Sequence, residues 1–99
     1  MKVVFSAEAI ADLEEIGDYI AKDSPRRART FLAELRDASL DIAHFPEKFQ
    51  LVPRYERDGL RRRPHGAYLI FYTIEPEFIA VVHILHGAQD YEAILAPPG

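Results

Sequence analysis

Two almost uninterrupted apolar runs in the last third of the chain constrain its fold most. Residues 67–75 and 78–85 consist mainly of β-branched, aromatic and aliphatic side chains, and a turn at Glu75-Pro76-Glu77 separates them. Because short apolar runs joined by a turn are typical of paired strands, they predict an antiparallel hairpin. Polar and apolar residues do not alternate regularly within them. This pattern is typical of central strands that are buried on both faces.

The first half of the chain predicts two amphipathic helices. Ser6 is suited to cap the first helix, and Ser24-Pro25 is a strong start signal for the second. The second helix should run to about His44, because Phe45-Pro46 ends it. The predicted apolar face of the first helix is Ile10, Leu13, Ile16 and Ile20, and that of the second is Ala28, Phe31, Leu32, Leu35 and Ile42. A connection of about three residues makes the two helices an antiparallel hairpin.

These elements predict an α+β fold. An N-terminal strand at Lys2–Phe5 precedes the helical hairpin, and a strand at Leu60–Pro64 opens the sheet, with His65-Gly66 as a turn. The expected architecture is an N-terminal strand and an antiparallel two-helix hairpin packed on a small antiparallel sheet. Two helices cover only one face of that sheet, and no later segment is expected to be long enough to cover the other. The second face is therefore expected to need a partner.

Size and composition set the remaining limits. The 99 residues predict a single domain at 1–95 with a frayed tail at 96–99. The sequence contains no cysteine, which excludes disulfides and thiolate chemistry, and no recurrent ligand spacing predicts a metal or another cofactor. No apolar stretch approaches the ~18 residues of a membrane span, and the N-terminus does not resemble a signal peptide. We expect a cytoplasmic protein that does not bind membranes.

Positive charge is concentrated in one part of the chain. Residues 46–66 carry six basic and three acidic side chains, whereas residues 67–99 carry four acidic side chains and no Lys or Arg. A local excess of this kind is typical of one anion-binding surface and not of a general nucleic-acid binder. Within Arg61-Arg62-Arg63, strand alternation allows only Arg61 and Arg63 to share a face. A solvated edge strand that resists edge pairing is the alternative interpretation.

Several short motifs occur in an order and spacing that point to one known family. They are Ala11–Ile16 with Tyr19-Ile20, Ala43–Pro46, Leu60–Arg62, Gly66–Tyr72, and His83–Gly87 with Gln89-Asp90. With these motifs, residues 1–95 resemble the ParE/RelE superfamily of type II toxin–antitoxin toxins, and the closing His86-Gly87 is more similar to the ParE branch. The resemblance implies a helical hairpin against a small antiparallel sheet, which is the architecture expected from the residues alone.

The resemblance also implies a function. A ParE-like protein is expected to inhibit DNA gyrase, to be captured by a cognate antitoxin in a hetero-oligomer, and not to bind DNA directly without that antitoxin. We expect the docking segment of the antitoxin to carry acidic residues. ParE-like chains usually have basic residues after His-Gly, where this chain has Ala88 and Gln89. If those cations contact the target, this chain is weakened or has another target. The predicted contact residues for target or antitoxin are Arg54, Arg57, Arg61, Arg63 and His86.

Two other functions stay open at this point. A RelE-like ribonuclease needs an acid–base group and cations on the phosphate, and His86, Tyr91 and Arg61 are the candidates. His83 is three residues from His86 on one predicted strand, so the two rings should point to opposite faces. The structural interpretation of His83 is a hydrogen-bonded residue of the sheet, and that of His86 is a cap at a strand end. The third possibility is a non-toxic family member that only binds antitoxin.

Overall fold

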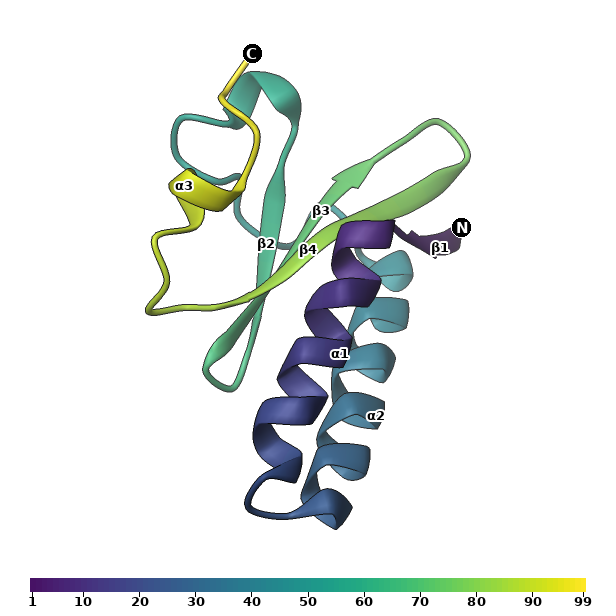
Figure 1. Cartoon of the computed structure of the whole chain (residues 1–99). Coiled ribbons are helices and arrows are strands. Elements are labelled where there is room, and N and C mark those ends of the chain that lie inside the picture. The colour runs from purple at the N-terminus through teal and green to yellow at the C-terminus, as the bar shows by residue number, and fades with distance from the viewer.

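A helical hairpin lies against a four-stranded sheet in the computed structural model, which describes all residues, Met1–Gly99 (Figure 1). The predicted α+β class and order of elements are confirmed. The strands are β1 (Lys2–Phe5), β2 (Arg61–His65), β3 (Tyr68–Ile74) and β4 (Phe78–His86). The helices are α1 (Ala7–Ala21), α2 (Pro25–Asp41) and the short α3 (Tyr91–Ile94), with 3₁₀ turns η1 (Ile42–His44) and η2 (Glu56–Asp58).

Both long helices begin at the predicted caps. The Ser6 hydroxyl accepts the Ala9 N–H at 3.0 Å, and the Ser24 hydroxyl accepts the Arg27 N–H at 3.1 Å. Each hydroxyl thereby supplies the partner that a first-turn amide lacks within its own helix. α2 passes directly into η1, so helical backbone continues to the predicted end. None of the helices combines the length and the apolarity needed to cross a membrane.

The sheet has the strand order β1-β4-β3-β2. β2, β3 and β4 pair antiparallel as predicted, but β1 joins β4 in parallel, so the complete sheet is mixed. The long connection through both helices permits this parallel pairing, and nothing in the sequence of β1 specifies its neighbour. Tyr72 pairs with Val81 and Phe71 with His83, which leaves Val82 as an extra residue in β4. On either side of this bulge, successive side chains of β4 point to opposite faces of the sheet, although the apolar run shows no such alternation in the sequence.

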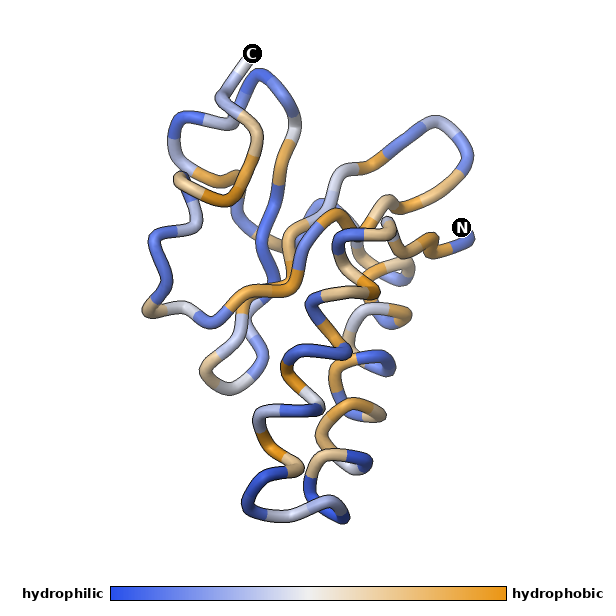
Figure 2. Tube along the Cα trace, in the orientation of Figure 1, coloured by the Kyte–Doolittle hydropathy of each residue, from blue (hydrophilic) through white to orange (hydrophobic).

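α1 and α2 pack on one face of the sheet (Figure 1). The apolar residues of the strands and of the facing helix sides are visible as the orange segments of Figure 2. Ile10 departs from the predicted helix face, because it is 48% exposed whereas Ala9 and Gly17 are buried. A Cβ atom at Gly17 would lie 2.8 Å from Leu32 Cδ1, so the missing side chain lets the two helices approach closely. The fully buried centre of this core is Ala9, Leu35, Ile42, Ile70, Tyr72, Ile79 and Val81.

The chain itself covers much of the other face, so the expectation that this face needs a partner is wrong as a general statement. Residues 51–60 and the C-terminal segment pack over Phe71, which is completely buried, and Leu95 is only 7% exposed. Regular helices are not the only possible cover for a sheet face. An irregular connection covers a sheet equally well where a few of its apolar side chains point inward. The cluster on this face consists of Val52, Tyr55, Leu60, Phe71, Leu85 and Leu95.

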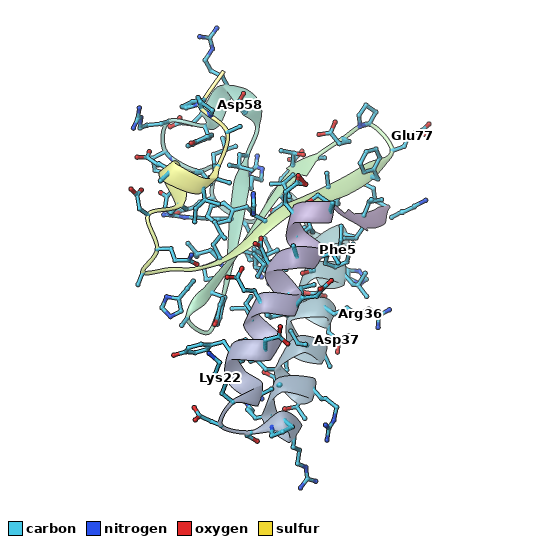
Figure 3. The ribbon with its side chains drawn as sticks, in the orientation of Figure 1. Phe5, Lys22, Arg36, Asp37, Asp58 and Glu77 are labelled. Atoms are coloured by element: carbon cyan, nitrogen blue, oxygen red, sulfur yellow. The ribbon has the colours of Figure 1, made fainter.

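The C-terminal segment forms one helical turn, α3. Beyond Leu95 the chain has no helix or strand. The Gly99 N–H nevertheless donates a hydrogen bond to Asp58 Oδ2 at 3.0 Å, so the last residue lies next to η2. Figure 3 shows Asp58 close to the C-terminal end, far from Glu77 at the tip of the β3–β4 hairpin.

Candidate functional site

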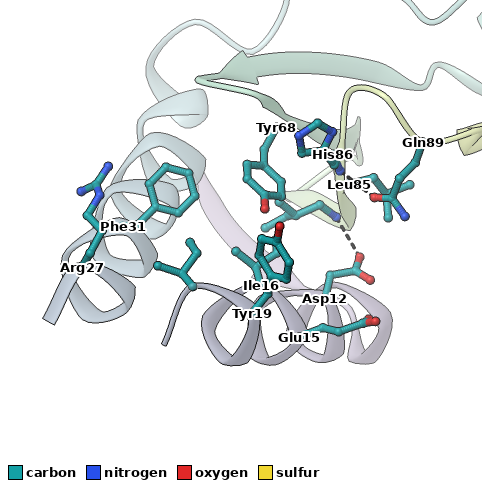
Figure 4. A pocket seen from close by; sticks show the side chains of 12 residues that line it. Asp12, Glu15, Ile16, Tyr19, Arg27, Phe31, Tyr68, Leu85, His86 and Gln89 are labelled. Carbon is teal, nitrogen blue, oxygen red and sulfur yellow. Dashed lines mark hydrogen bonds between the residues drawn. The ribbon is translucent and has the colours of Figure 1, made fainter. Parts of the chain in front are cut away.

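An open groove lies where the end of β4 meets α1 and α2 (Figure 4). Its volume is about 570 Å³, and we call it the aromatic groove. Tyr19 and Tyr68 extend toward one another across it in Figure 4. Tyr19 is 69% exposed, which is unusual for so large a side chain on a helix that packs on a sheet. The polar residues of the groove are Asp12, Glu15, Arg27, His86 and Gln89, and its apolar residues include Ile16, Ile20, Phe31 and Ile84.

Tyr68 is the centre of a chain of aromatic contacts in this groove. Its ring lies 5.5 Å from the Phe31 ring and 5.2 Å from the His86 ring, the latter edge-to-face. Such contacts hold rings in fixed orientations. Burial, together with the neighbouring Tyr19, raises the pKa of Tyr68 above the ordinary value for a tyrosine. The phenol is therefore neutral at physiological pH and keeps its hydroxyl proton for a hydrogen bond.

The His86-Gly87 turn forms one edge of the aromatic groove. The His86 N–H donates to Gln89 Oε1 at 2.8 Å, and the Ala88 N–H donates to His86 Nδ1 at 3.0 Å. Because Nδ1 accepts a hydrogen bond, the neutral ring carries its proton on Nε2. His86 thus closes the strand end through one nitrogen and keeps the other for the groove. Gln89 is part of this turn.

Asp12 fastens α1 to β4 beside the groove. Its Oδ2 atom accepts the Ile84 N–H at 2.9 Å and lies 2.8 Å from His83 Nδ1. The side chains of Asp12 and His83 are only 15% and 17% exposed. His83 is therefore the hydrogen-bonded sheet residue that the sequence indicated. It aligns with Phe71 whereas His86 aligns with Tyr68, so the two histidines lie on opposite faces as predicted.

Arg61 and Arg63 share the helix-facing side of β2, as strand alternation predicted. Both guanidinium groups make contacts within the chain. Arg61 Nη1 donates to the carbonyl oxygens of Glu47 and Phe49 at 3.1 and 2.7 Å. Arg63 Nη1 donates to the Ala38 carbonyl oxygen at 2.9 Å, and its guanidinium lies 5.0 Å from the centre of the Phe49 ring. These two residues hold the end of α2 and the following connection against the sheet.

The other two predicted contact residues lie elsewhere. Arg54 is exposed and pairs with Glu92 at 3.2 Å, while Arg57 lies in η2 with no hydrogen bond or ion pair inside the chain. The four arginines therefore do not form one continuous surface. A role for them in binding stays a prediction, and Arg57 has the guanidinium that is freest to take it.

Comparison with known proteins gives the family. The model of the family described as "ParE toxin of type II toxin-antitoxin system, parDE" matches residues 3–91. The chain belongs to the ParE toxin family. This family lies within the ParE/RelE superfamily to which the sequence motifs pointed, and its members are toxins of type II toxin–antitoxin systems.

One relative of this ParE-family toxin is Toxin RelE2 of Caulobacter vibrioides, which is 32% identical over 88 residues, or 89% of this chain and 97% of the relative. Two solved structures share the fold. The chromosomal ParDE system from P. aeruginosa matches with a TM-score of 0.72 at 17% identity, covering 87% of this chain and 95% of that one. The RelBE2 complex from Mycobacterium tuberculosis matches with a TM-score of 0.61 at 24% identity, covering 86% and 95%.

The three residues considered for ribonuclease chemistry are not brought together in this ParE-family toxin. Arg61 is held on the helix side of β2, whereas Tyr91 packs on the opposite face with its ring 5.3 Å from the Phe71 ring. Arg62, which the sequence analysis did not choose, reaches the Tyr91 hydroxyl at 3.4 Å. Strand alternation could have identified it, because alternation places Arg62 on the face that α3 covers. No group of three or more metal-ligating side chains gathers anywhere in the chain.

Sequence reasoning also missed the aromatic groove. Tyr19 and Tyr68, each taken alone, are ordinary aromatic residues that give no sign of a shared groove. Tyr19 lies next to Ile20 of the apolar stripe and so at its border, which is the one signal that could have indicated exposure. The groove itself depends on how the helices lie against the end of β4, and no local pattern encodes that distance.

The ion pair between Arg63 and Asp41 predicts a pH dependence of stability. The hydrogen bond from Arg63, 2.9 Å long, holds the pKa of the Asp41 carboxyl below its ordinary value of 3.8. Because the folded-state pKa is the lower one, the stabilisation is fully present above pH 3.8 and is lost as the pH falls through the folded-state pKa. The stability difference between wild type and Asp41→Asn should therefore shrink toward acid pH in urea titrations. Asp37→Asn, an exposed acid of the same helix without an ion pair, should show no such trend.

Proposed function

We propose that this ParE-family toxin acts by binding other proteins: it inhibits DNA gyrase, and a cognate antitoxin neutralises it by occupying the aromatic groove. The observation that carries the proposal is the exposed aromatic surface of Tyr19 beside Tyr68 and His86. Large aromatic side chains in a partly desolvated groove with a polar rim are the composition of strong protein–protein contacts. Family membership supports the gyrase target, because ParE-like toxins are expected to inhibit that enzyme.

The groove offers a partner both apolar area and directional contacts. The Tyr68 hydroxyl and His86 Nε2 can donate hydrogen bonds, while Asp12 and Glu15 provide negative charge on one side and Arg27 positive charge on the other. An apolar helix or strand of the antitoxin with a cation near Glu15 and an acid near Arg27 would match this distribution. The two solved structures compared above belong to toxin–antitoxin systems, which supports an antitoxin as the partner.

We also propose roles for the four arginines that the sequence indicated as contact residues. Arg57 is exposed and unpaired, and Arg54 is exposed with only a surface ion pair, so both are suited to acidic residues of a partner. Arg61 and Arg63 already have intramolecular acceptors. We therefore assign them the support of the surface rather than direct contact. Substitutions at Arg61 or Arg63 consequently test folding and binding together, and Arg57→Glu is the cleaner test of charge recognition.

Inhibition through binding requires no acid–base pair, and this agrees with the separation of His86, Tyr91 and Arg61. The one feature that favours RNA cleavage is the proximity of Arg62 to Tyr91, because Arg62 also lines another groove together with Lys48. A phosphate could lie against these cations. The ribonuclease function is therefore the second candidate.

A supercoiling assay tests the first candidate. Purified toxin at micromolar concentration should block supercoiling by DNA gyrase, and equimolar antitoxin should restore it, because both proteins compete for surfaces of the same toxin. A folded toxin that leaves supercoiling unchanged would contradict the proposal. Discrete cuts in mRNA on ribosomes, lost in Tyr91→Phe, would then favour the ribonuclease. A chain that fails to arrest growth when induced without antitoxin is the non-toxic member of the family.

A further inference from the structure

A second groove, with a volume of about 580 Å³, opens on the face of the sheet opposite the helical hairpin. It lies where the first turn of α1, η2 and the C-terminal segment approach β4. We call it the acidic groove. It shares no lining residue with the aromatic groove. The Asp12–His83 contact lies between the two grooves, because Asp12 lines the aromatic groove and His83 lines the acidic groove. The residues that matter for its chemistry are Glu8, Asp58, Val82, His83, Ile94 and Leu95.

The floor of the acidic groove is apolar and only partly covered. It is the portion of the second sheet face that residues 51–60 and α3 leave open. Val82, the bulged residue of β4, is partly accessible, and Ile94 is 41% exposed at the edge. On the same face of β1, Val4 is 38% exposed. An apolar surface that continues from a buried cluster into solvent gains free energy when a second apolar segment covers it.

The rim of the groove is negatively charged. Glu8 has no hydrogen bond or ion pair within the chain, and Asp58 accepts only the Gly99 N–H. No Lys or Arg lines the groove. The Nδ1 atom of His83 is hydrogen-bonded to the Asp12 carboxylate, so Nε2 is the ring nitrogen that remains for a ligand in the groove. The carboxylates of Glu8 in α1 and Asp58 in η2 lie on two sides of an apolar floor. The groove therefore favours cationic groups and repels phosphates and acidic peptides.

We propose that the acidic groove binds a protein segment in which Lys or Arg side chains are interspersed with apolar side chains. The apolar side chains cover Val82 and Ile94, and the cations reach Glu8 on one side and Asp58 on the other. This preference for cations is the reverse of that proposed for Arg54 and Arg57, which are suited to acidic residues of a partner. The toxin thus has two contact surfaces of opposite charge preference, and this second surface does not depend on whether gyrase or RNA is the target.

A peptide probe tests the assignment on the intact chain. An octapeptide that alternates Leu with Arg should bind, and it should shift backbone amide resonances of Glu8, Val82 and Ile94. The double substitution Glu8→Gln with Asp58→Asn should weaken binding about tenfold, because it removes two rim charges and keeps the shapes of the side chains. Glu77→Gln at the distant hairpin tip removes a charge outside the groove and should change affinity by less than about twofold (Figure 3).

Matched controls separate groove binding from general attraction to an acidic protein. Ile94→Ser should weaken binding of the peptide, whereas Ile10→Ser, at a similarly exposed apolar site outside the groove, should not. The proposal is overturned if the peptide does not bind at millimolar concentration. It is also overturned if Glu77→Gln weakens binding as much as the double substitution, if a Leu–Glu octapeptide binds equally well, or if the shifted resonances belong to the aromatic groove. A self-associated protein that protects the same amides would assign the groove to a second copy and overturn the proposal as well.

Discussion

Phe71→Ala should lower the free energy of unfolding by about 3–5 kcal/mol, the usual range for removing a fully buried phenylalanine. Phe71 has no exposed surface, and it belongs to the cluster that residues 51–60 and Leu95 form on the second face. A small domain is stabilised by only about 5–15 kcal/mol, so this single change removes a large part of the total. Denaturation in urea, followed by circular dichroism, measures the effect.

The size of the effect matters because it tells whether the chain covers its own sheet. If the second face needed a partner, the isolated toxin would expose Phe71, and its truncation would cost less than about 1 kcal/mol. Val4→Ala is the matched control, since Val4 lies in the same sheet but is 38% exposed. A loss at Phe71 no larger than that at Val4 would contradict the packing of residues 51–60 described above. Leu95→Ala should behave like Phe71→Ala, although with a smaller loss.

Tyr19→Ala should weaken antitoxin binding by about 30–100-fold, which corresponds to about 2–3 kcal/mol and to the truncation of an aromatic residue at the centre of an interface. The stability of the free toxin should hardly change, because Tyr19 is 69% exposed and has few contacts to lose. Isothermal titration calorimetry of the purified pair measures the affinity. Loss of affinity without loss of stability is the signature that distinguishes a contact residue from a structural one.

Ile10→Ala provides the control for this experiment. Ile10 lies on the same helix and is 48% exposed, but it does not line the aromatic groove. Its truncation should leave the antitoxin affinity within about twofold. Equal effects of the two substitutions would show that the antitoxin covers all of α1 and would contradict the central place given to the groove. Unchanged affinity in Tyr19→Ala would move the antitoxin to another surface.

The arginines illustrate how far sequence reasoning could go toward the site. Alternation correctly placed Arg61 and Arg63 on one side of β2, because side-chain direction along a strand is a local property. It could not reveal that on this side Arg63 donates a hydrogen bond to the Ala38 carbonyl oxygen and lies over the Phe49 ring. Charge density alone therefore identified arginines that hold the fold together as candidates for binding.

Some features of this protein follow from its sequence alone. Caps at Ser6 and Ser24, the helical stripes, and the two apolar runs around the Glu75-Pro76-Glu77 turn determine the elements and the α+β class, because each depends on neighbours within a few residues. The ordered motifs from Ala11 to Asp90 likewise identified the superfamily. These signals are local, so they can be recognised in the sequence without knowledge of the tertiary structure.

Only the tertiary structure decided where surfaces are open and where they are closed. The parallel partner of β1, the cover over Phe71 and the exposure of Tyr19 all depend on segments that are distant in the chain. An apolar side chain becomes part of the core when another segment of the chain packs on it, and otherwise it stays available as a contact surface. Burial lowers the free energy in either case, but only the tertiary structure determines which segment covers the side chain. For this reason the sequence could name the toxin family, whereas the aromatic groove and the acidic groove became visible only in the folded chain.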